Sequence, residues 1–385
     1  MHAWTEDQRL LLQSIEKFAQ KELAPVAMQL DEEELFNEKA FRKMADLGIL
    51  GITVQDTYGG PGLGAVEATL AMEKIGEYCA STALSYLAHS MLCVNNLHEN
   101  GSDAQKRKYL PDLMNGKKIG AMAMTEPEAG SDALGMRTRA IKKGNHYYLT
   151  GSKWFITNGP YADVFVVYAR TGENKKDIST FIVEKGFPGF KVGKKLHKMG
   201  MRASPTSELI FENCEVPEEN LMGKGNDSVA HMMKNLNIER ITISGISLGI
   251  SQACLNYVCK YAKERHQFGV AIAQKQMIQE KIADMCTQLD AGRCLTYTAA
   301  RSYDQGTHRN AKSSMSLGAK AKLFTAEMAT KAGLDAIQIL GGYGYMKEYP
   351  VERYMRDAKL MEIGAGTNEV MRLIIARDLL EVESD

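Results

Sequence analysis

The sequence predicts an α+β protein, mainly helical, in which a middle antiparallel β-domain separates an N-terminal helical domain from a C-terminal bundle of the four-helix type. Apolar residues recur at helical spacing in both ends of the chain, whereas the middle part alternates apolar and polar residues. The length of 385 residues also exceeds what one ordinary core accommodates. We therefore expect three domains, at residues 1–118, 119–226 and 227–385.

Composition narrows the class of protein. The formal net charge is zero, so we expect no binding to nucleic acid or to an anionic membrane. No apolar run approaches the ~20 residues that span a bilayer, and the chain opens with an amphipathic helical pattern instead of a signal peptide. Seven cysteines without a C-x-x-C pair favour a reducing compartment over a disulfide framework or a zinc site. We expect a soluble protein of the cytoplasm or, in a processed eukaryotic form, the mitochondrial matrix.

The first domain reads as helices separated by a turn. Residues 9–23, RLLLQSIEKFAQKEL, carry apolar side chains at three-to-four spacing, which predicts an amphipathic helix. DTYGGPGLG, residues 56–64, is a glycine- and proline-rich turn. A long apolar-rich helical stretch follows to residue 101.

The second domain reads as short strands. Residues 145–170, NHYYLTGSKWFITNGPYADVFVVYAR, alternate aromatic or β-branched residues with polar ones and are broken by turn residues. DISTFIVEKG, GFKVGKKL and SELIFENCEV continue the pattern, which predicts an antiparallel barrel or sandwich.

The third domain returns to helical spacing from about residue 227. Three long helical segments with short connections are followed by two shorter ones, VERYMRDAKLME and EVMRLIIARDLL. This pattern predicts an antiparallel helical bundle.

Two segments of the β-domain have both a structural and a functional interpretation. AMAMTEPEAGSD, residues 121–132, is a strand and a turn, or its small residues allow backbone amides and the Ser131 hydroxyl to approach a phosphate or a ring. SKWFITNG, residues 152–159, is a strand ending in a turn, or Thr157 forms a hydrogen bond with a planar cofactor.

Three segments of the third domain are equally ambiguous when each is taken alone. KERHQFGVAIAQKQ, residues 263–276, places Arg265 at a helix end, where it interacts with the helix dipole or a ligand. QILGGYGY, residues 338–345, is a helix stop at two glycines. In MEIGAGTNEV, residues 361–370, the segment from Thr367 is expected to cap a new helix.

The order and spacing of EPEAGSD, KWFITNG, ERHQFG, QILGGYGY and AGTNEV resemble the acyl-CoA dehydrogenase family across nearly the whole chain. The resemblance implies an acyl-CoA substrate, FAD held between the β-domain and the bundle, electron-transferring flavoprotein as partner, a homotetramer and no metal. It places some cofactor contacts in the β-domain, and others, including Arg265 and Gln276, against the adenine-nucleotide part of FAD in a neighbouring subunit. The implied FAD-binding residues are Met122, Met124, Thr125, Gly130, Ser131, Phe155, Ile156, Thr157, Arg265, Phe268, Gln276, Gln338, Gly341, Gly342, Thr367 and Glu369.

The resemblance also implies a substrate site. The chain departs from the family pattern at three positions. The implied substrate-binding residues are Ser131, Asn237, Arg240, Gly364, Ala365 and Gly366. Trp154 precedes Phe155 where many members have the tryptophan second, Lys275 replaces a usual aromatic residue, and Asn237 stands where an Asp is common.

The catalytic carboxylate of most family members is missing from its usual position. The reaction needs a base for the α-proton of the thioester, donors to the developing enolate, and transfer of the β-hydrogen to flavin N5 as hydride. Most members carry the base in a Tyr-Glu-Gly-Thr sequence, but here those positions are Gly364, Ala365, Gly366 and Thr367. The backbone N–H of Ala365 is still expected to serve as the enolate donor.

Glu239, in NLNIERITISG at the start of the first bundle helix, is the candidate replacement base. Most helix glutamates are simply solvated, but the apolar residues that follow predict a buried carboxylate with a raised pKa. The Asn-Ile-Glu-Arg context and the Gly-Ala-Gly-Thr loop resemble the isovaleryl-CoA dehydrogenase branch of the family, where this helix carries the base.

These features predict FAD-dependent α,β-dehydrogenation of a short branched-chain acyl-CoA, with Gly364 making room at the branching carbon. The alternatives are a dehydrogenase or enoyl-CoA reductase for a cyclic or aryl-substituted acyl-CoA, and a flavin-free acyl-CoA-binding relative.

Overall fold

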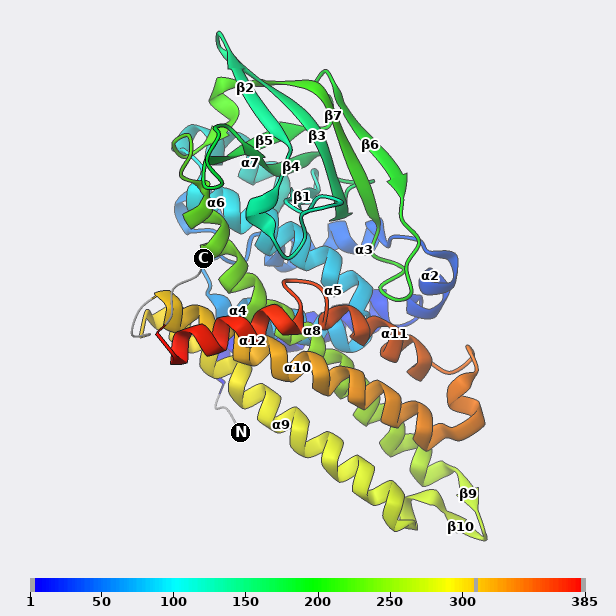
Figure 1. Ribbon diagram of the computed structural model, residues 1–385. Coiled ribbons are helices and arrows are strands. Elements are labelled where there is room, and N and C mark those ends of the chain that lie inside the picture. The colour runs from blue at the N-terminus through cyan, green and yellow to red at the C-terminus, as the bar shows by residue number, and fades with distance from the viewer. Residues whose placement is uncertain (1–3, 308–310, 382–385) are drawn as a thin grey trace.

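The computed structural model describes residues 4–307 and 311–381, so parts of the predicted first and third domains (residues 1–3, 308–310 and 382–385) lie outside the described residues. The chain forms helices, then a sheet, then helices again, which confirms the predicted fold class (Figure 1). The sheet and the helices against it form one end of the molecule, and the long helices extend away from it (Figure 1).

The N-terminal part is a layer of short helices. Helix α1 (Glu6–Phe18) begins with a reciprocal capping box between Thr5 and Gln8 and continues as a π-helical turn, Ala19–Leu23. The long apolar stretch predicted after residue 64 is divided into several helices, because the backbone of Cys79 is extended and a π-helical segment intervenes. The helices are α2 (Ala27–Glu33), α3 (Glu38–Lys43), α4 (Ala65–Tyr78), α5 (Ala80–Leu87), α6 (Asn96–Asn100) and α7 (Asp103–Met114), with the π-helical segment at Ala88–Asn95.

The β-domain is one sheet in the order β6-β7-β3-β2-β4-β5-β8, with β1 paired to β4. The predicted sheet was wholly antiparallel, and this detail is wrong: β1 pairs with β4 in parallel, and Arg139 of β2 bridges Arg170 of β4 in parallel. The antiparallel β2–β3 hairpin lies between β1 and β4 in the chain. This intervening segment allows β4 to run beside β1 in the same direction. The strands are β1 (Gly120–Ala123), β2 (Arg139–Lys143), β3 (His146–Thr157), β4 (Val164–Arg170), β5 (Ile178–Glu184), β6 (Phe190–Lys195), β7 (Thr206–Pro217) and β8 (Leu221–Met222).

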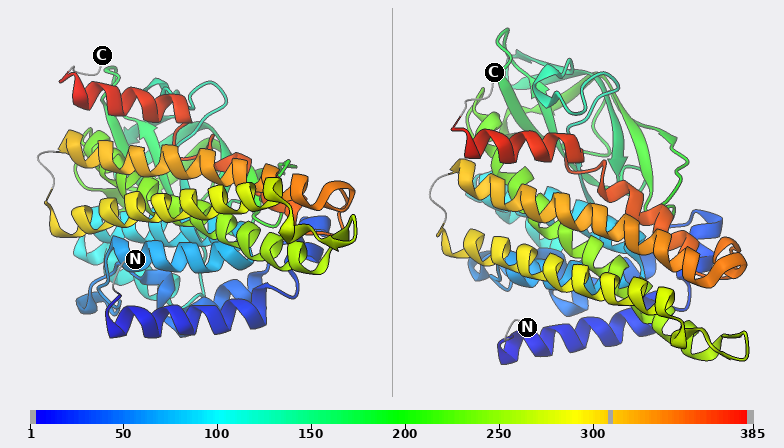
Figure 2. Two further views of the ribbon diagram at one scale, coloured as in Figure 1. Left: turned by 90° about the horizontal axis from the view of Figure 1, so that it is seen from below. Right: turned by 60° about the horizontal axis from the view of Figure 1, so that its bottom comes forward.

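The bundle consists of three long helices that run side by side and two shorter ones (Figure 2). Helix α4 packs along α8 through glycines: a Cβ added to Gly245 would lie 2.7 Å from the Thr69 carbonyl oxygen, and one on Gly249 would lie 2.4 Å from that of Glu73. The predicted loop between the first two long helices contains a small hairpin, β9 (His266–Gln267) and β10 (Val270–Ala271). The helices are α8 (Ser228–Glu264), α9 (Gln276–Gln305), α10 (Ala311–Leu340), α11 (Val351–Met361) and α12 (Asn368–Leu379).

Helix α8 is long and apolar enough to cross a membrane by length and composition alone, contrary to the expectation that no such run exists. However, 78% of its most apolar window is buried against the rest of the protein, as in the core helix of a soluble protein. The seven cysteines are all free, in agreement with the expectation of no disulfide framework. Over the described ranges, no group of three or more His, Cys, Asp or Glu side chains is placed to hold a metal ion.

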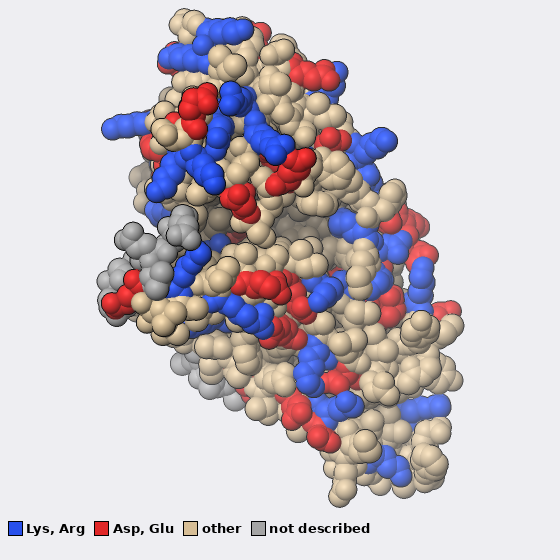
Figure 3. All heavy atoms as spheres, viewed as in Figure 1, with Lys and Arg blue, Asp and Glu red and all other residues tan. Residues whose placement is uncertain are grey.

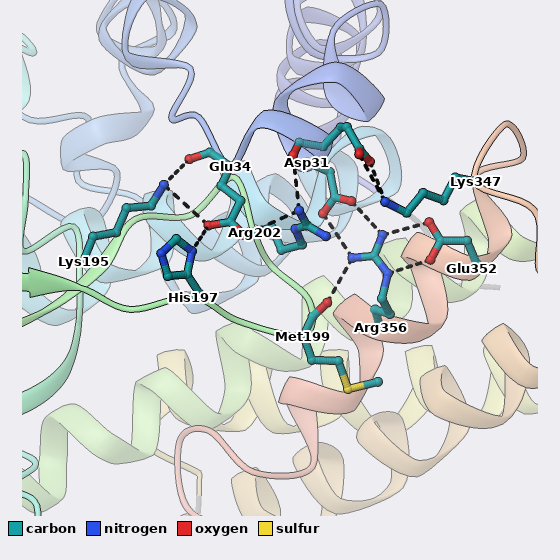
Figure 4. Close-up of polar contacts among 10 residues, drawn as sticks. Asp31, Glu34, Lys195, His197, Met199, Arg202, Lys347, Glu352 and Arg356 are labelled. Carbon is teal, nitrogen blue, oxygen red and sulfur yellow. Dashed lines mark hydrogen bonds and ion pairs between the residues drawn. The ribbon is translucent and has the colours of Figure 1, made fainter.

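A cluster of ion pairs connects the three parts of the chain next to α11 (Figure 4). Arg356 of α11 pairs with Glu352 of the same helix and with Asp31 of α2, both at 2.6 Å, and donates to the Met199 carbonyl oxygen at 3.0 Å. The next residue, Asp357, accepts a hydrogen bond from the backbone N–H of Met201. Helix α11 is therefore bound to both the N-terminal helices and the segment after β6.

The face in Figure 3 carries basic and acidic side chains intermingled, in line with the zero net charge. The same view shows a hollow between the β-domain and the bundle (Figure 3).

Candidate active site

Glu239 lies inside α8, not at its start as the sequence suggested. The helix begins at Ser228 because residues 228–236 already have helical spacing of apolar side chains, so Glu239 is about three turns from the N-terminus. The residue is 6% exposed, and its Oε2 atom has no hydrogen-bond partner among the described residues. A buried carboxylate oxygen without a partner is a rare arrangement that points to a functional role.

The environment of Glu239 raises its pKa. Burial is the main cause and brings the pKa to about 7, while the nearby cations Arg240 and Lys322 act in the opposite direction. A carboxyl group that ionises near neutral pH is suited to general-base catalysis.

The loop between α11 and α12 is held next to Glu239 by two cationic side chains. Arg240, on α8, donates from Nε to the Ala365 carbonyl oxygen at 3.3 Å. Lys322, on α10, donates from Nζ to the Gly366 carbonyl oxygen at 2.8 Å and to Oδ1 of Asn368 at 3.0 Å. The structure therefore brings the candidate base and the Gly-Ala-Gly-Thr loop together.

The loop backbone has an uncommon shape. Ala365 has φ +57° and Gly366 has φ +91°, which are two consecutive left-handed conformations. Among the described residues, the Ala365 backbone N–H donates to no backbone acceptor. This N–H is therefore available as a donor. The hydroxyl of Thr367 accepts from the Val370 N–H at 3.3 Å and caps α12, which confirms the capping prediction.

The positions around Ala365 differ in the space and contacts they offer. A Cβ on Gly364 would come no closer than 3.5 Å to any neighbour, the Leu360 carbonyl oxygen, so a larger side chain has room to leave the backbone. Asn237 donates to the Ser314 hydroxyl at 2.8 Å, and its buried Oδ1 has no partner in the described part of the chain. Glu369 is exposed in the first turn of α12.

The β-domain residues predicted to contact FAD lie together. The Trp154 N–H donates to the Thr125 carbonyl oxygen at 2.8 Å, and Lys153 Nζ donates to that of Met124 at 2.9 Å, so the segment after β1 runs beside the end of β3. The ring of Phe155 is 64% exposed, and its φ of +59° turns it away from the strand alternation. Ile156 is buried, Met122, Met124, Thr125 and Thr157 are half-buried, and Gly130 and Ser131 are exposed.

An exposed apolar ring, a free hydroxyl and an open glycine fit a flat cofactor with phosphates. No neighbour lies within 4 Å of a Cβ added to Gly130, which leaves the backbone there open to approach.

Thr367 and Glu369 lie at the start of α12, next to the Ala365 loop. The remaining predicted FAD contacts are carried by the elements at the far end of the bundle, near β9 and β10 and away from the sheet (Figure 1). A groove of about 470 Å³ there is lined by Arg265, Gly341 and Gly342, and the Arg265 guanidinium stacks on the Tyr343 ring at 5.2 Å. Phe268 (92% exposed), Gln276 and Gln338 are exposed at the same end. The residues at this end and those beside β3 therefore belong to elements that lie apart within one chain.

Sequence reasoning missed two buried groups of the site region. Lys322 occupies the apolar stripe of α10 together with Ala319, Ala326 and Ala329, and a lysine in such a stripe is the signal that was overlooked. Glu126 pairs with Lys153 at 2.8 Å and accepts from the backbone N–H groups of Arg137 and Thr138, which fixes the segment after β1. This pairing is long-range and has no local sequence signal.

Three family models match the chain in order. They are described as acyl-CoA dehydrogenase N-terminal domain, over residues 5–117, middle domain, over 121–214, and C-terminal domain, over 227–380. The mitochondrial isovaleryl-CoA dehydrogenase of Pongo abelii is 48% identical over 379 residues, covering 97% of this chain and 88% of that protein.

Solved structures give the same result. Butyryl-CoA dehydrogenase from Megasphaera elsdenii is similar with a TM-score of 0.95 and 38% identity, covering 99% of this chain and 100% of that one. A chain in the structure described as "Electron transferring flavoprotein of Acidaminococcus fermentans: Towards a mechanism of flavin-based electron bifurcation" has a TM-score of 0.95 and 42% identity, with 99% of each chain covered.

Proposed function

Because the chain belongs to the acyl-CoA dehydrogenase family of FAD-dependent oxidoreductases, we propose that it dehydrogenates a short branched-chain acyl-CoA of the isovaleryl-CoA type to the 2-enoyl-CoA. The observation that carries the proposal is the buried Glu239 carboxylate beside a loop in which Ala365 replaces the usual base. The similarity to an isovaleryl-CoA dehydrogenase supports the acyl group.

Glu239 takes the α-proton. Its unpartnered Oε2 is the proton acceptor, and its burial keeps water away from the carboxylate. The raised pKa makes the carboxylate a stronger base than an exposed glutamate, while about half of the molecules remain ionised near neutral pH. When bound, FAD supplies the acceptor for the β-hydrogen, which leaves as hydride.

The backbone N–H of Ala365 stabilises the enolate that forms as the α-proton leaves. A preorganised backbone donor directed at the thioester oxygen lowers the barrier because it does not have to reorganise during the reaction. Arg240 and Lys322 hold the carbonyl oxygens of Ala365 and Gly366, so the peptide units around this donor are fixed before substrate binds.

Gly364 shapes the acyl pocket. A ring at this position would stand between the loop and the acyl chain, and its absence leaves space for a branch. Asn237 and Ser131 are proposed as further substrate contacts.

FAD is proposed to bind between the β-domain of one chain and the far end of the bundle of a neighbouring copy. Within one chain the sheet that contains β3 lies at one end of the molecule and the β9–β10 hairpin at the other (Figure 1). This separation of the elements that carry the two groups supports the arrangement, and a homotetramer provides it. Electron-transferring flavoprotein is the proposed acceptor, supported by the A. fermentans structure. The zero net charge and the free cysteines support a soluble, reducing location, the cytoplasm or the mitochondrial matrix.

The test is anaerobic flavin bleaching by a panel of acyl-CoAs: isovaleryl, isobutyryl, 2-methylbutyryl, butyryl, octanoyl, glutaryl and cyclohexanecarbonyl. We expect the purified protein to be yellow and isovaleryl-CoA to bleach it with the highest kcat/KM. Faster bleaching by butyryl-CoA or the cyclic thioester would contradict the proposed acyl group. Oxidation of the reduced enzyme by purified electron-transferring flavoprotein tests the acceptor separately.

A further inference from the structure

Lys322 is a buried cation that touches the loop but no acidic side chain. It is 1% exposed, and within the described ranges no carboxylate lies within 4.0 Å of its Nζ atom. Its hydrogen bonds go to the Gly366 carbonyl oxygen at 2.8 Å and to Oδ1 of Asn368 at 3.0 Å. Burying an ammonium group without a directly bonded counter-ion is unfavourable, so its retention needs a reason.

We propose that Lys322 is a positioning residue that fixes the left-handed turn at Ala365 and Gly366 and holds the Glu239 carboxylate in its charged form. This proposal rests on the proposed role of Glu239 as the base. It assigns Lys322 two separable actions, one through hydrogen bonds and the other through charge.

The hydrogen-bonding action is visible in the geometry of the loop. A non-glycine residue in the left-handed region is disfavoured by roughly 1–2 kcal/mol, so the φ of +57° at Ala365 requires support from its surroundings. Each residue of the left-handed turn has its carbonyl oxygen bound by a cation. Arg240 binds that of Ala365, and Lys322 binds that of Gly366. These bonds fix the two peptide units that follow the Ala365 Cα, and the Ala365 N–H, which lies in the preceding unit, is linked to them through the φ angle of Ala365.

The charge action follows from the groups that face Glu239. Arg240 is the next residue on α8, and Lys322 on α10 binds the neighbouring carbonyl of the same loop. The charges of both side chains favour the ionised form of Glu239. Tyr168 of β4 lies close enough to interact electrostatically with Glu239, and its hydroxyl accepts a hydrogen bond from Asn96 at 2.8 Å. Burial is the main cause that raises the pKa of this phenol, and the Glu239 charge adds to it. Tyr168 is neutral near pH 7 and leaves the two cations as the charged neighbours.

Lys322 is itself sensitive to this environment. The pKa of Lys322 is lowered to about 8, mainly by burial and also by Arg240, while Glu239, Glu362 and Glu369 act in the opposite direction. Near pH 7 it is therefore mainly a cation, and removing it should raise the pKa of Glu239.

Three variants separate the two actions. Lys322→Met removes both the charge and the hydrogen bonds, whereas Lys322→Gln removes the charge but keeps an N–H donor that can reach the Gly366 carbonyl oxygen. Lys331→Met is the matched control, because it makes the same substitution on the same helix at an exposed lysine that pairs with Asp335.

Two readouts are measured on the holoenzyme across pH. The first is the rate of flavin reduction by isovaleryl-CoA. The second is infrared difference titration of the protonated carboxyl band, assigned to Glu239 by its loss in Glu239→Gln. We expect both Lys322 variants to move the acid limb of the rate profile and the infrared midpoint upward by about one pH unit, the lower end of what a nearby opposite charge does.

The rates at pH 7 should differ between the variants. Lys322→Met should reduce the rate of flavin reduction about ten- to hundredfold, and Lys322→Gln should reduce it less. Lys331→Met should change neither the rate nor the infrared midpoint. A midpoint unchanged in Lys322→Gln and Lys322→Met overturns the charge action, and equal rates in these two variants overturn the hydrogen-bonding action. If the infrared midpoint moves but the rate profile does not follow it, the inference about Lys322 stands and Glu239 is not the base. If Lys322→Met does not fold, Lys322→Gln alone decides the charge action.

Discussion

Replacing Glu239 with glutamine should abolish turnover and stabilise the protein at the same time. Glutamine keeps the shape of the side chain but cannot accept the α-proton, so flavin reduction should fall by at least ~10²–10⁴-fold while FAD and acyl-CoA still bind. Stability should change because the glutamate carries a charge into a buried site, whereas the amide does not.

The size of the stabilisation follows from the pKa of Glu239. The folded-state pKa of about 7 lies above the ordinary value of 4.5, so the folded protein binds this proton more tightly than the unfolded chain does. Below the ordinary value both states are protonated and the substitution has no effect on ionisation. As pH rises toward 7, Glu239 ionises in the unfolded chain but stays protonated in the folded protein, so the wild type loses stability. Above pH 7 the folded protein ionises too, and the loss of stability stops growing. The folded-state and ordinary pKa values differ by about 2.5. Because one pKa unit corresponds to about 1.4 kcal/mol, the substitution should raise the free energy of unfolding by about 3 kcal/mol.

Thermal unfolding of the two holoproteins at several pH values tests this reasoning. For 385 residues, about 3 kcal/mol corresponds to a rise in Tm of about 4 °C at pH 8. At pH 5 this glutamate is still mostly ionised in the unfolded chain, so the difference should shrink to about 1 °C. A difference in Tm that is the same at both pH values would show that packing, and not ionisation, changed. Near-normal flavin reduction in the variant would remove Glu239 from the mechanism.

Three further sets of variants test other parts of the site. Gly364→Tyr should lower the ratio of kcat/KM for isovaleryl-CoA to that for butyryl-CoA by about tenfold, since the ring fills the space for a branch; an unchanged ratio means that Gly364 does not shape the pocket. The double variant Glu239→Gly with Ala365→Glu should reduce flavin faster than Glu239→Gly alone. Ala365→Glu alone should slow the enzyme, because two neighbouring carboxylates raise each other's pKa. A double variant that binds FAD but is no faster than Glu239→Gly would contradict this reasoning. Arg265→Met should weaken FAD binding at least tenfold. The flavin absorbance that stays with the protein on gel filtration measures this, provided that the oligomer elutes at the same size, and full flavin retention would contradict the contact.

Features governed by local chemistry were predictable from the sequence. Thr367 caps α12 as expected, because the hydroxyl and the N–H three residues later are close in any chain that starts a helix there. The burial of Glu239 was also predictable, since the apolar residues that follow it leave no solvent-facing side to the helix. Glu239 was expected at the start of that helix, but residues 228–236 extend the helix before it.

Features set by contacts between distant segments were not predictable. The parallel pairing of β1 with β4 depends on where the chain returns after a hairpin, which alternation of residues does not encode. Lys322 lies 44 residues from its partner Gly366 in the chain, so only the packed bundle reveals the contact. The roles of the substrate and cofactor residues and the three domain boundaries stay predictions.

Helix α11 gives this protein an order in which it becomes active. Its middle is held by Arg356 and Asp357 to α2 and to the segment after β6, and its last residue, Met361, directly precedes the loop that carries Ala365. A chain whose helices have formed but whose β-domain has not yet docked keeps the Asp31 contact but lacks the contacts of Arg356 and Asp357 to the segment after β6, so α11 and the loop after it are held less firmly. During refolding, helical circular dichroism should therefore recover before dehydrogenase activity, and activity then reports the docking of the β-domain, not the formation of the bundle.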